Sequence, residues 1–166
     1  MELSNFLTTV LAGILGTVAM TLVMYGYSLI SQQNTRVMAI LGSMVTGSPT
    51  VPNDKWKRNL AGTVGHFGIG IIFSLSYFLL WNWGFFAIEI GDSLWIGLIS
   101  GVIAVIVWGS YFHLHHNPPK VDLFHFFIAL LIAHVVFGLV TVNLYSYLAQ
   151  PSEFWFEFRQ RINAMN

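Results

Sequence analysis

Histidine is the residue type through which this chain could do chemistry, because it has six histidines and no cysteine. Two of them, His66 and His134, fall inside long apolar segments, where ionisable residues are rare and usually face the interior of a helix bundle. At equal depth, two imidazoles could ligate one centre, either the iron of haem b or a divalent transition metal. Gly70 and Gly138 each follow a histidine by one helical turn. They would open space beside a ligand or let two helices approach closely.

A second group of histidines gathers around a predicted turn, and short histidine-rich tracts can bind a divalent metal. The alternative is that these are unliganded side chains at the edge of a loop. Their spacing does not match the histidine boxes of membrane di-iron hydroxylases. The candidate metal ligands of this group are His113, His115, His116 and His125.

Two other interpretations of His66 and His134 stay open. Each could be a neutral side chain hydrogen-bonded to a neighbouring helix, with the glycines serving packing, or the two could line a proton or substrate pathway. Thr17, Met20 and Thr21 follow small residues and indicate a packing face. No Walker loop, nucleophile elbow or HExxH motif is present, so an enzyme is the less expected class.

The elements that position these histidines are predicted to be membrane-spanning helices. Hydrophobic residues make up 55% of the 166 residues and charged residues only 8%, so lipid must be the solvent. The net charge of zero gives no electrostatic reason to expect nucleic acid as a partner. Four segments are apolar, free of Asp, Glu, Lys and Arg, and long enough to span a bilayer: 6–30, 59–81, 93–112 and 123–148.

The connections also carry information. The first apolar run is too long for a signal-peptide core, so we expect a retained helix. In the longest connection, 31–58, the apolar segment 35–45 is too short to span and predicts an interfacial or re-entrant helix. The tail 149–166 is amphipathic and is expected on the membrane surface. Most Lys and Arg residues fall in the first and third loops, which predicts a cytoplasmic location for these loops and periplasmic termini.

An internal repeat is also visible, although apolar helices can resemble one another by chance. It predicts a four-helix bundle built from a duplicated helical hairpin, with a pseudo-two-fold axis along the membrane normal. The second and fourth helices overlay with a shift of 68 residues, and the first and third with a shift of 84. The pairs include Ala61 with Ala129, His66 with His134, Gly70 with Gly138, Tyr77 with Tyr145, and Gly13 with Gly97.

Four short motifs carry a family resemblance. They are AGILGTVAMT at 12–21, GHFGIG at 65–70, the helix from Gly97 to Trp108, and HVVFG at 134–138. Together they resemble the YagU-like and related bacterial four-helix inner-membrane proteins, over most of the chain. The resemblance implies a small multi-pass protein of the bacterial inner membrane, and it implies no reaction, cofactor or catalytic residue. The histidine cluster at 113–116 is not part of it.

Three functions are therefore expected as candidates. The first is a redox or accessory subunit in which His66 and His134 bind haem b or a transition metal. The second is a small proton-linked transporter or channel in which the same histidines line the pathway. The third is a structural accessory subunit with no site of its own. In each case the expected partners are the lipid bilayer and either further copies of the chain or a larger membrane complex.

Overall fold

The computed structural model describes residues 3–47, 55–149, 160 and 162–164. The described part of the chain is helical and contains no strand. Four of its helices are long and apolar enough to cross a membrane, so the chain is a multi-pass helical membrane protein. Most of the predicted amphipathic tail lies outside the described residues. The helices are α1 (Leu3–Ser31), α2 (Val37–Thr46), α3 (Lys55–Asn82), α4 (Ile90–Leu114) and α5 (Leu123–Ala149).

The outer surface of the bundle explains why it needs lipid. Only 28–39% of each long helix's most apolar stretch is buried inside the protein. The remainder is largely apolar, as on α4, where Trp95, Val102 and Ile106 are exposed. Such a surface is unfavourable in water but matches hydrocarbon. A helix also satisfies its own backbone hydrogen bonds, which hydrocarbon requires of any segment that spans it.

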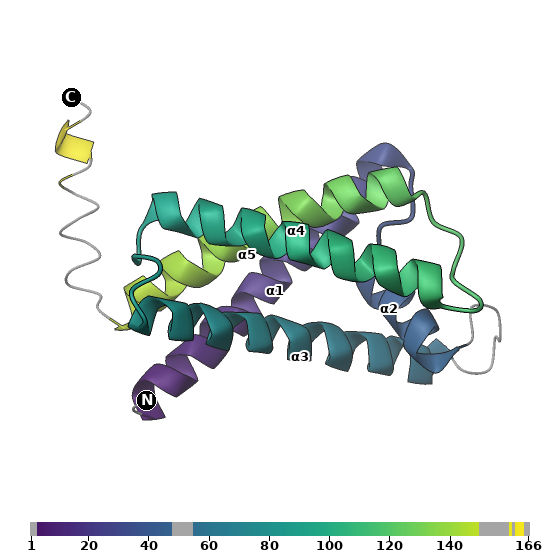
Figure 1. Cartoon of the computed structure of the whole chain (residues 1–166), viewed down its shortest axis with the longest axis horizontal. Helices are drawn as coiled ribbons and strands as arrows, with labels where there is room; N and C mark the ends of the chain where they lie inside the picture. Colours follow the sequence, from purple (N-terminus) through teal and green to yellow (C-terminus); the bar gives the residue numbers. More distant parts are fainter. Residues whose placement is uncertain (1–2, 48–54, 150–159, 161, 165–166) are drawn as a thin grey trace.

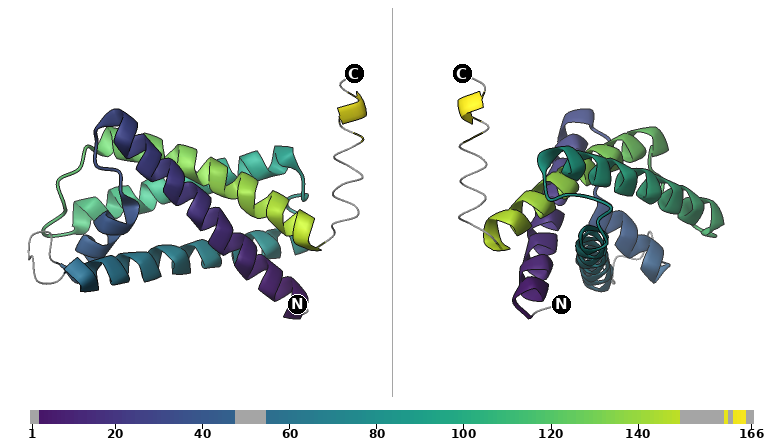
Figure 2. Two further views of the ribbon diagram at one scale, coloured as in Figure 1. Left: turned by 180° about the vertical axis from the view of Figure 1, so that it is seen from behind. Right: turned by 60° about the vertical axis from the view of Figure 1, so that its left-hand side comes forward.

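Successive long helices run antiparallel, α1 to α3 and α4 to α5 (Figure 1), and α1 packs more extensively on α5 than on α3. In the view from behind, α1 crosses α5 diagonally (Figure 2), and these two helices pack closely. The N-terminus and the α3–α4 loop lie at one end of the bundle. The α4–α5 loop and α2 lie at the other end, together with the start of α3.

Glycines bring the helices of each pair into close contact. A Cβ atom on Gly13 would lie 2.7 Å from the Cβ atom of Ser74, where α1 crosses α3. A Cβ atom on Gly138 would lie 2.7 Å from the Cα atom of Gly97, where α5 crosses α4. Gly13 and Gly97 are equivalent in the predicted repeat, so the two pairs cross at corresponding positions of the first and third predicted spans. The duplication itself stays a prediction.

The short helix α2 begins inside the bundle. After α1 ends at Ser31, the chain turns back, and the hydroxyl of Thr35 donates a hydrogen bond to the carbonyl of Met24 at 2.6 Å. Met24 lies about 10 Å along the helix axis before Ser31, at 1.5 Å per residue. The chain therefore turns back alongside α1 before α2 begins.

α2 is held by close backbone contact with α3. A Cβ atom on Gly62 would collide with the carbonyl oxygen of Met38, and one on Gly42 would collide with the carbonyl oxygen of Arg58. Val37, Ile40, Leu41 and Met44 are also buried. The helix is therefore packed against α3 at this end of the bundle, while Val45 at its end is exposed. The choice between an interfacial and a re-entrant helix stays a prediction.

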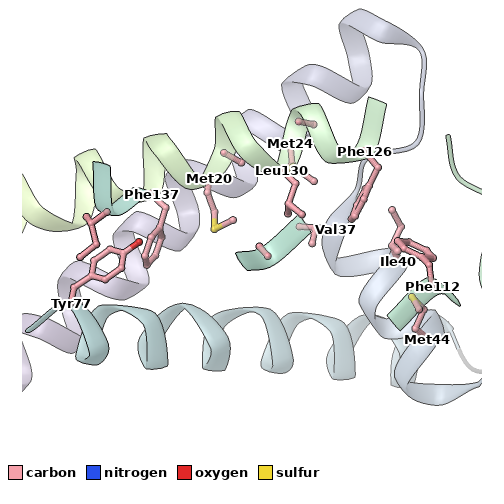
Figure 3. Close-up of a cluster of buried hydrophobic side chains, with 14 of the residues drawn as sticks. Met20, Met24, Val37, Ile40, Met44, Tyr77, Phe112, Phe126, Leu130 and Phe137 are labelled. Atoms are coloured by element: carbon pink, nitrogen blue, oxygen red, sulfur yellow. The ribbon is translucent and has the colours of Figure 1, made fainter. Parts of the chain in front are cut away.

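The apolar core runs along the bundle between the helix pairs. Aromatic residues fill it, including Tyr77 and Phe137 toward one end and Phe112 and Phe126 toward the other (Figure 3). Edge-to-face pairs order these rings, with Phe112 and Phe126 at 5.6 Å between centroids.

Candidate functional site

A cavity of about 110 Å³ lies in the middle of the bundle, and both intramembrane histidines line it. His66 reaches it from α3 and His134 from α5. Most of the other lining residues are apolar, so the two imidazoles are its main polar groups. The sequence placed these histidines on different helices at an expected equal depth, and the fold brings them to one space.

The cavity exists because α1 and α5 pack closely together, whereas α3 and α4 do not. α1 and α5 pack so closely that a Cβ atom on Gly16 would collide with the hydroxyl oxygen of Thr141. α3 and α4 make few direct contacts, although the hydroxyl groups of Tyr77 and Ser100 are hydrogen-bonded at 2.6 Å. In the predicted repeat, these two interfaces would be equivalent. The difference between them leaves the space into which the histidines face.

One nitrogen of the His66 ring is hydrogen-bonded to a side chain of α1. Its Nε2 atom lies 3.0 Å from the hydroxyl oxygen of Thr21. That hydroxyl donates its only proton to the carbonyl of Thr17, at 2.6 Å, so toward His66 it can only accept. His66 therefore donates from Nε2–H, and in the neutral ring the lone pair is on Nδ1.

The His134 ring is held by its own helix. Its Nδ1 atom is 2.8 Å from the carbonyl oxygen of Leu130, which can only accept, so Nδ1 carries the proton and Nε2 the lone pair. Phe73 meets the ring edge-on, with 5.9 Å between the ring centroids. Val105 stands on α4 where the predicted repeat would place the counterpart of Thr21, and valine offers no acceptor. This difference explains why the two histidines have different partners.

The arrangement presents two imidazoles whose protons are already directed at protein acceptors. Both side chains are buried, and burial of an unpaired charge is unfavourable, so burial favours the neutral form of both rings. Metal-ligating histidines commonly donate their second ring N–H to a carbonyl or similar acceptor, which fixes the tautomer and leaves the other nitrogen free for the metal. The geometry is therefore suited to a metal ion or to a small hydrogen-bond donor.

The size of the cavity separates the two predicted cofactors. Sites for drug-sized ligands typically enclose roughly 300–1,000 Å³, and haem is a ligand of that size or larger. The cavity of about 110 Å³ is well below this range. It has room for a single ion with a few waters, so the geometry favours a metal ion over haem b.

The two glycines of the predicted site have different surroundings. Gly70 lines the cavity, and a Cβ atom there would also collide with the hydroxyl of Thr17. Gly138 is not among the cavity-lining residues and lies in the crossing of α5 with α4, where a Cβ would be 2.9 Å from the backbone nitrogen of Gly97. Both permit close helix contact, and Gly70 alone also borders the site.

The second histidine group does not gather at one point. His115 donates from Nε2 to the carbonyl of Met44 at 3.0 Å, while its Nδ1 accepts the backbone N–H of Asn117. The Nδ1 atom of His125 is hydrogen-bonded to the hydroxyl of Tyr27 at 2.9 Å.

The hydrogen bond of His115 links the end of α4 to α2, and that of His125 links α5 to α1. His113 borders a separate open hollow beside Lys120, and the ring of His116 stacks on that of His115. In the described part of the chain, no three His, Asp or Glu side chains form a group that could hold a metal ion.

The sequence interpretation missed the site roles of two α1 residues. Thr21 accepts the hydrogen bond from His66, and Met20 lines the same cavity as the two histidines. Both had been assigned only to a packing face. A signal was available, since a threonine and a thioether lie next to each other in an apolar helix that must pack against the histidine-bearing helix.

Comparison with known proteins adds no relative: no protein-family model, curated protein or solved structure matches the chain. The resemblance to the YagU-like proteins therefore stays a prediction.

Proposed function

We propose that this chain is a metal-binding protein of the bacterial inner membrane, in which His66 and His134 bind a single transition-metal ion inside the bundle. The observation that carries the proposal is the hydrogen bonding of the two rings. Each donates its one N–H to a protein acceptor, so each ring keeps one lone pair, and both side chains line the same cavity. Haem b, the larger cofactor considered, fits the cavity less well than an ion does.

A metal site without an acid–base or nucleophile constellation supports an accessory or redox role in a larger complex more than an enzyme activity. A second candidate, transport, is favoured by one observation. Val37, the first residue of the short helix α2, borders the cavity. Interrupted helices that begin within the membrane beside a binding site are typical of secondary transporters.

The orientation proposed for the chain follows the positive-inside rule. Arg36 and Lys120 belong to connections at one end of the bundle, and Lys55 begins α3 at the same end, which we assign to the cytoplasm. Single cysteines can test this, because the chain has none of its own. Gly91→Cys should react with a membrane-impermeant maleimide on intact cells, and Gln33→Cys should react only after lysis. The opposite pattern would reverse the topology.

Metal analysis of the purified protein in lipid nanodiscs tests the proposed site. The protein should bind about one transition-metal ion per chain, as expected for a single two-imidazole centre. His66→Gln and His134→Gln should each abolish binding, while His113→Gln should retain it. The last variant is also the matched control, because His113 is exposed at the end of α4 and belongs to the other histidine group.

The outcomes separate the alternatives. Binding lost only in His113→Gln would move the site to the second histidine group. A folded wild-type protein that binds no metal would refute the proposal and leave transport of another solute or a structural role. Metal-dependent flux in proteoliposomes, lost in His66→Gln, would favour the transporter over the accessory subunit.

A further inference from the structure

A third side chain of a type that can ligate a metal borders the cavity that both histidines line. Met20 reaches it from α1 and is only 5% exposed. It lies in the interior between Phe137 and Leu130, with its sulfur directed into the space toward α3 (Figure 3). A thioether, an imidazole from α3 and an imidazole from α5 thus border one cavity from three different helices.

We propose that the ion bound in this cavity is monovalent copper, Cu(I), and that Met20 is its third ligand. This inference rests on the proposed function and specifies its ion. Thioether sulfur is a soft ligand that favours Cu(I), whereas imidazole alone also suits zinc, nickel and divalent copper. With no cysteine in the chain, methionine is the soft donor that remains for such a site.

The absence of charged side chains from the described lining of the cavity gives an independent reason to expect a monovalent ion. Among the described residues that line it, none is Asp, Glu, Lys or Arg. A bound ion therefore keeps its full charge in a medium of low dielectric constant. The Born cost of burying an ion rises with the square of its charge, so a monovalent ion costs about a quarter as much as a divalent ion of the same size. Three neutral ligands without a carboxylate thus favour Cu(I) over Zn²⁺.

The α1 helix offers a matched control for Met20. Met24 is the next methionine on the same face of α1 and is fully buried, but it does not line the cavity. Leucine is close to methionine in volume, so both Met20→Leu and Met24→Leu should preserve packing within about 1.5 kcal/mol. A difference in copper binding between the two variants would therefore report ligation by sulfur.

The experiment is an anaerobic titration of the nanodisc-embedded protein with Cu(I), in competition with bathocuproine disulfonate, and a parallel titration with Zn²⁺. We expect one Cu(I) per chain and weaker Zn²⁺ binding. Met20→Leu should weaken Cu(I) binding by at least about tenfold, since even outer-shell partners account for roughly 10–100-fold. Met24→Leu should leave it unchanged. X-ray absorption should show copper–sulfur scattering in the wild type and Met24→Leu, and none in Met20→Leu.

Each result decides a separate point. Unchanged Cu(I) affinity in Met20→Leu, or no copper–sulfur scattering in the wild type, would overturn the role of Met20 and leave the two-histidine site standing. Zn²⁺ binding tighter than Cu(I) would overturn the choice of ion. Absence of any metal from the folded wild-type protein would refute the proposed function as well. If Met20→Leu does not fold, the scattering from the wild type alone decides whether sulfur is a ligand.

Discussion

The crossing of α4 with α5 makes Gly138→Ala the most informative packing variant. The added Cβ atom would lie 2.6 Å from the carbonyl oxygen of Ser93, 2.7 Å from the Cα atom of Gly97 and 2.9 Å from its nitrogen. All three neighbours are backbone atoms, which no change of rotamer can move. Ordinary van der Waals contact begins at 3.4 Å, so the two helices must separate by up to about 0.8 Å (3.4 − 2.6) at this point.

The expected loss of stability in Gly138→Ala follows from that separation of the helices. A radial gap of about 0.5–1 Å forfeits roughly a quarter to a half of the dispersion energy of the atoms around it. Overpacking of this kind typically lowers the free energy of unfolding by about 1–3 kcal/mol. Close approach at small residues is a principal source of stability between helices in lipid, so the cost should not be recovered elsewhere.

The matched control is Gly68→Ala, because a Cβ atom on Gly68 has no neighbour within 4 Å. Both variants change the intrinsic helix propensity equally, by up to about 1 kcal/mol, so their difference isolates the steric effect. Reversible unfolding by dodecyl sulfate in mixed micelles, followed by tryptophan fluorescence, measures it. If Gly138→Ala were as stable as Gly68→Ala, the close crossing of α4 and α5 would be wrong.

Three further variants probe the site and the short helix α2. Thr21→Val removes the acceptor that orients His66 and should weaken metal binding by roughly 10–100-fold in the competition titration, so unchanged affinity would argue against the tautomer assigned here. Thr35→Val removes the hydrogen bond that returns the chain to α1 and should lower the free energy of unfolding by about 1 kcal/mol in dodecyl sulfate titration; no change would show that this bond does not hold the segment. Ser43→Cys is buried in α2 and should resist maleimide, but should react rapidly when combined with Gly62→Ala, which forces α2 away from α3. Equal labelling with and without Gly62→Ala would contradict the close contact of these helices.

Much of the helical framework follows from sequence alone, because the length of a membrane span is a local property. About 20 apolar residues cross the hydrocarbon core, and a charge within them is costly wherever the helix packs. The ranges 6–30 and 123–148 therefore correspond closely to α1 and α5. Asn117, Pro118 and Pro119 similarly indicate where α4 must end.

The contacts of the site were decided by tertiary structure. The sequence shows that His66 and His134 lie inside apolar helices, but not that Thr21 accepts from one and the backbone of Leu130 from the other. The sequence also gives no sign that α1 and α5 pack closely while α3 and α4 make few direct contacts. Spacing along one helix sets which residues share a face, whereas the partner of that face depends on how the other helices pack.

The short helix α2 and the second histidine group illustrate the same limit. Short apolar length predicted that residues 35–45 do not span, yet only the hydrogen bond from Thr35 to Met24 places the start of α2 inside the bundle. His115 and His125 are near one another in sequence, but Met44 and Tyr27 hold them on separate contacts. Hydrophobicity and chain length act along the chain and can be read from it. Hydrogen bonds and close backbone crossings join residues far apart in sequence, so only the folded bundle determines them.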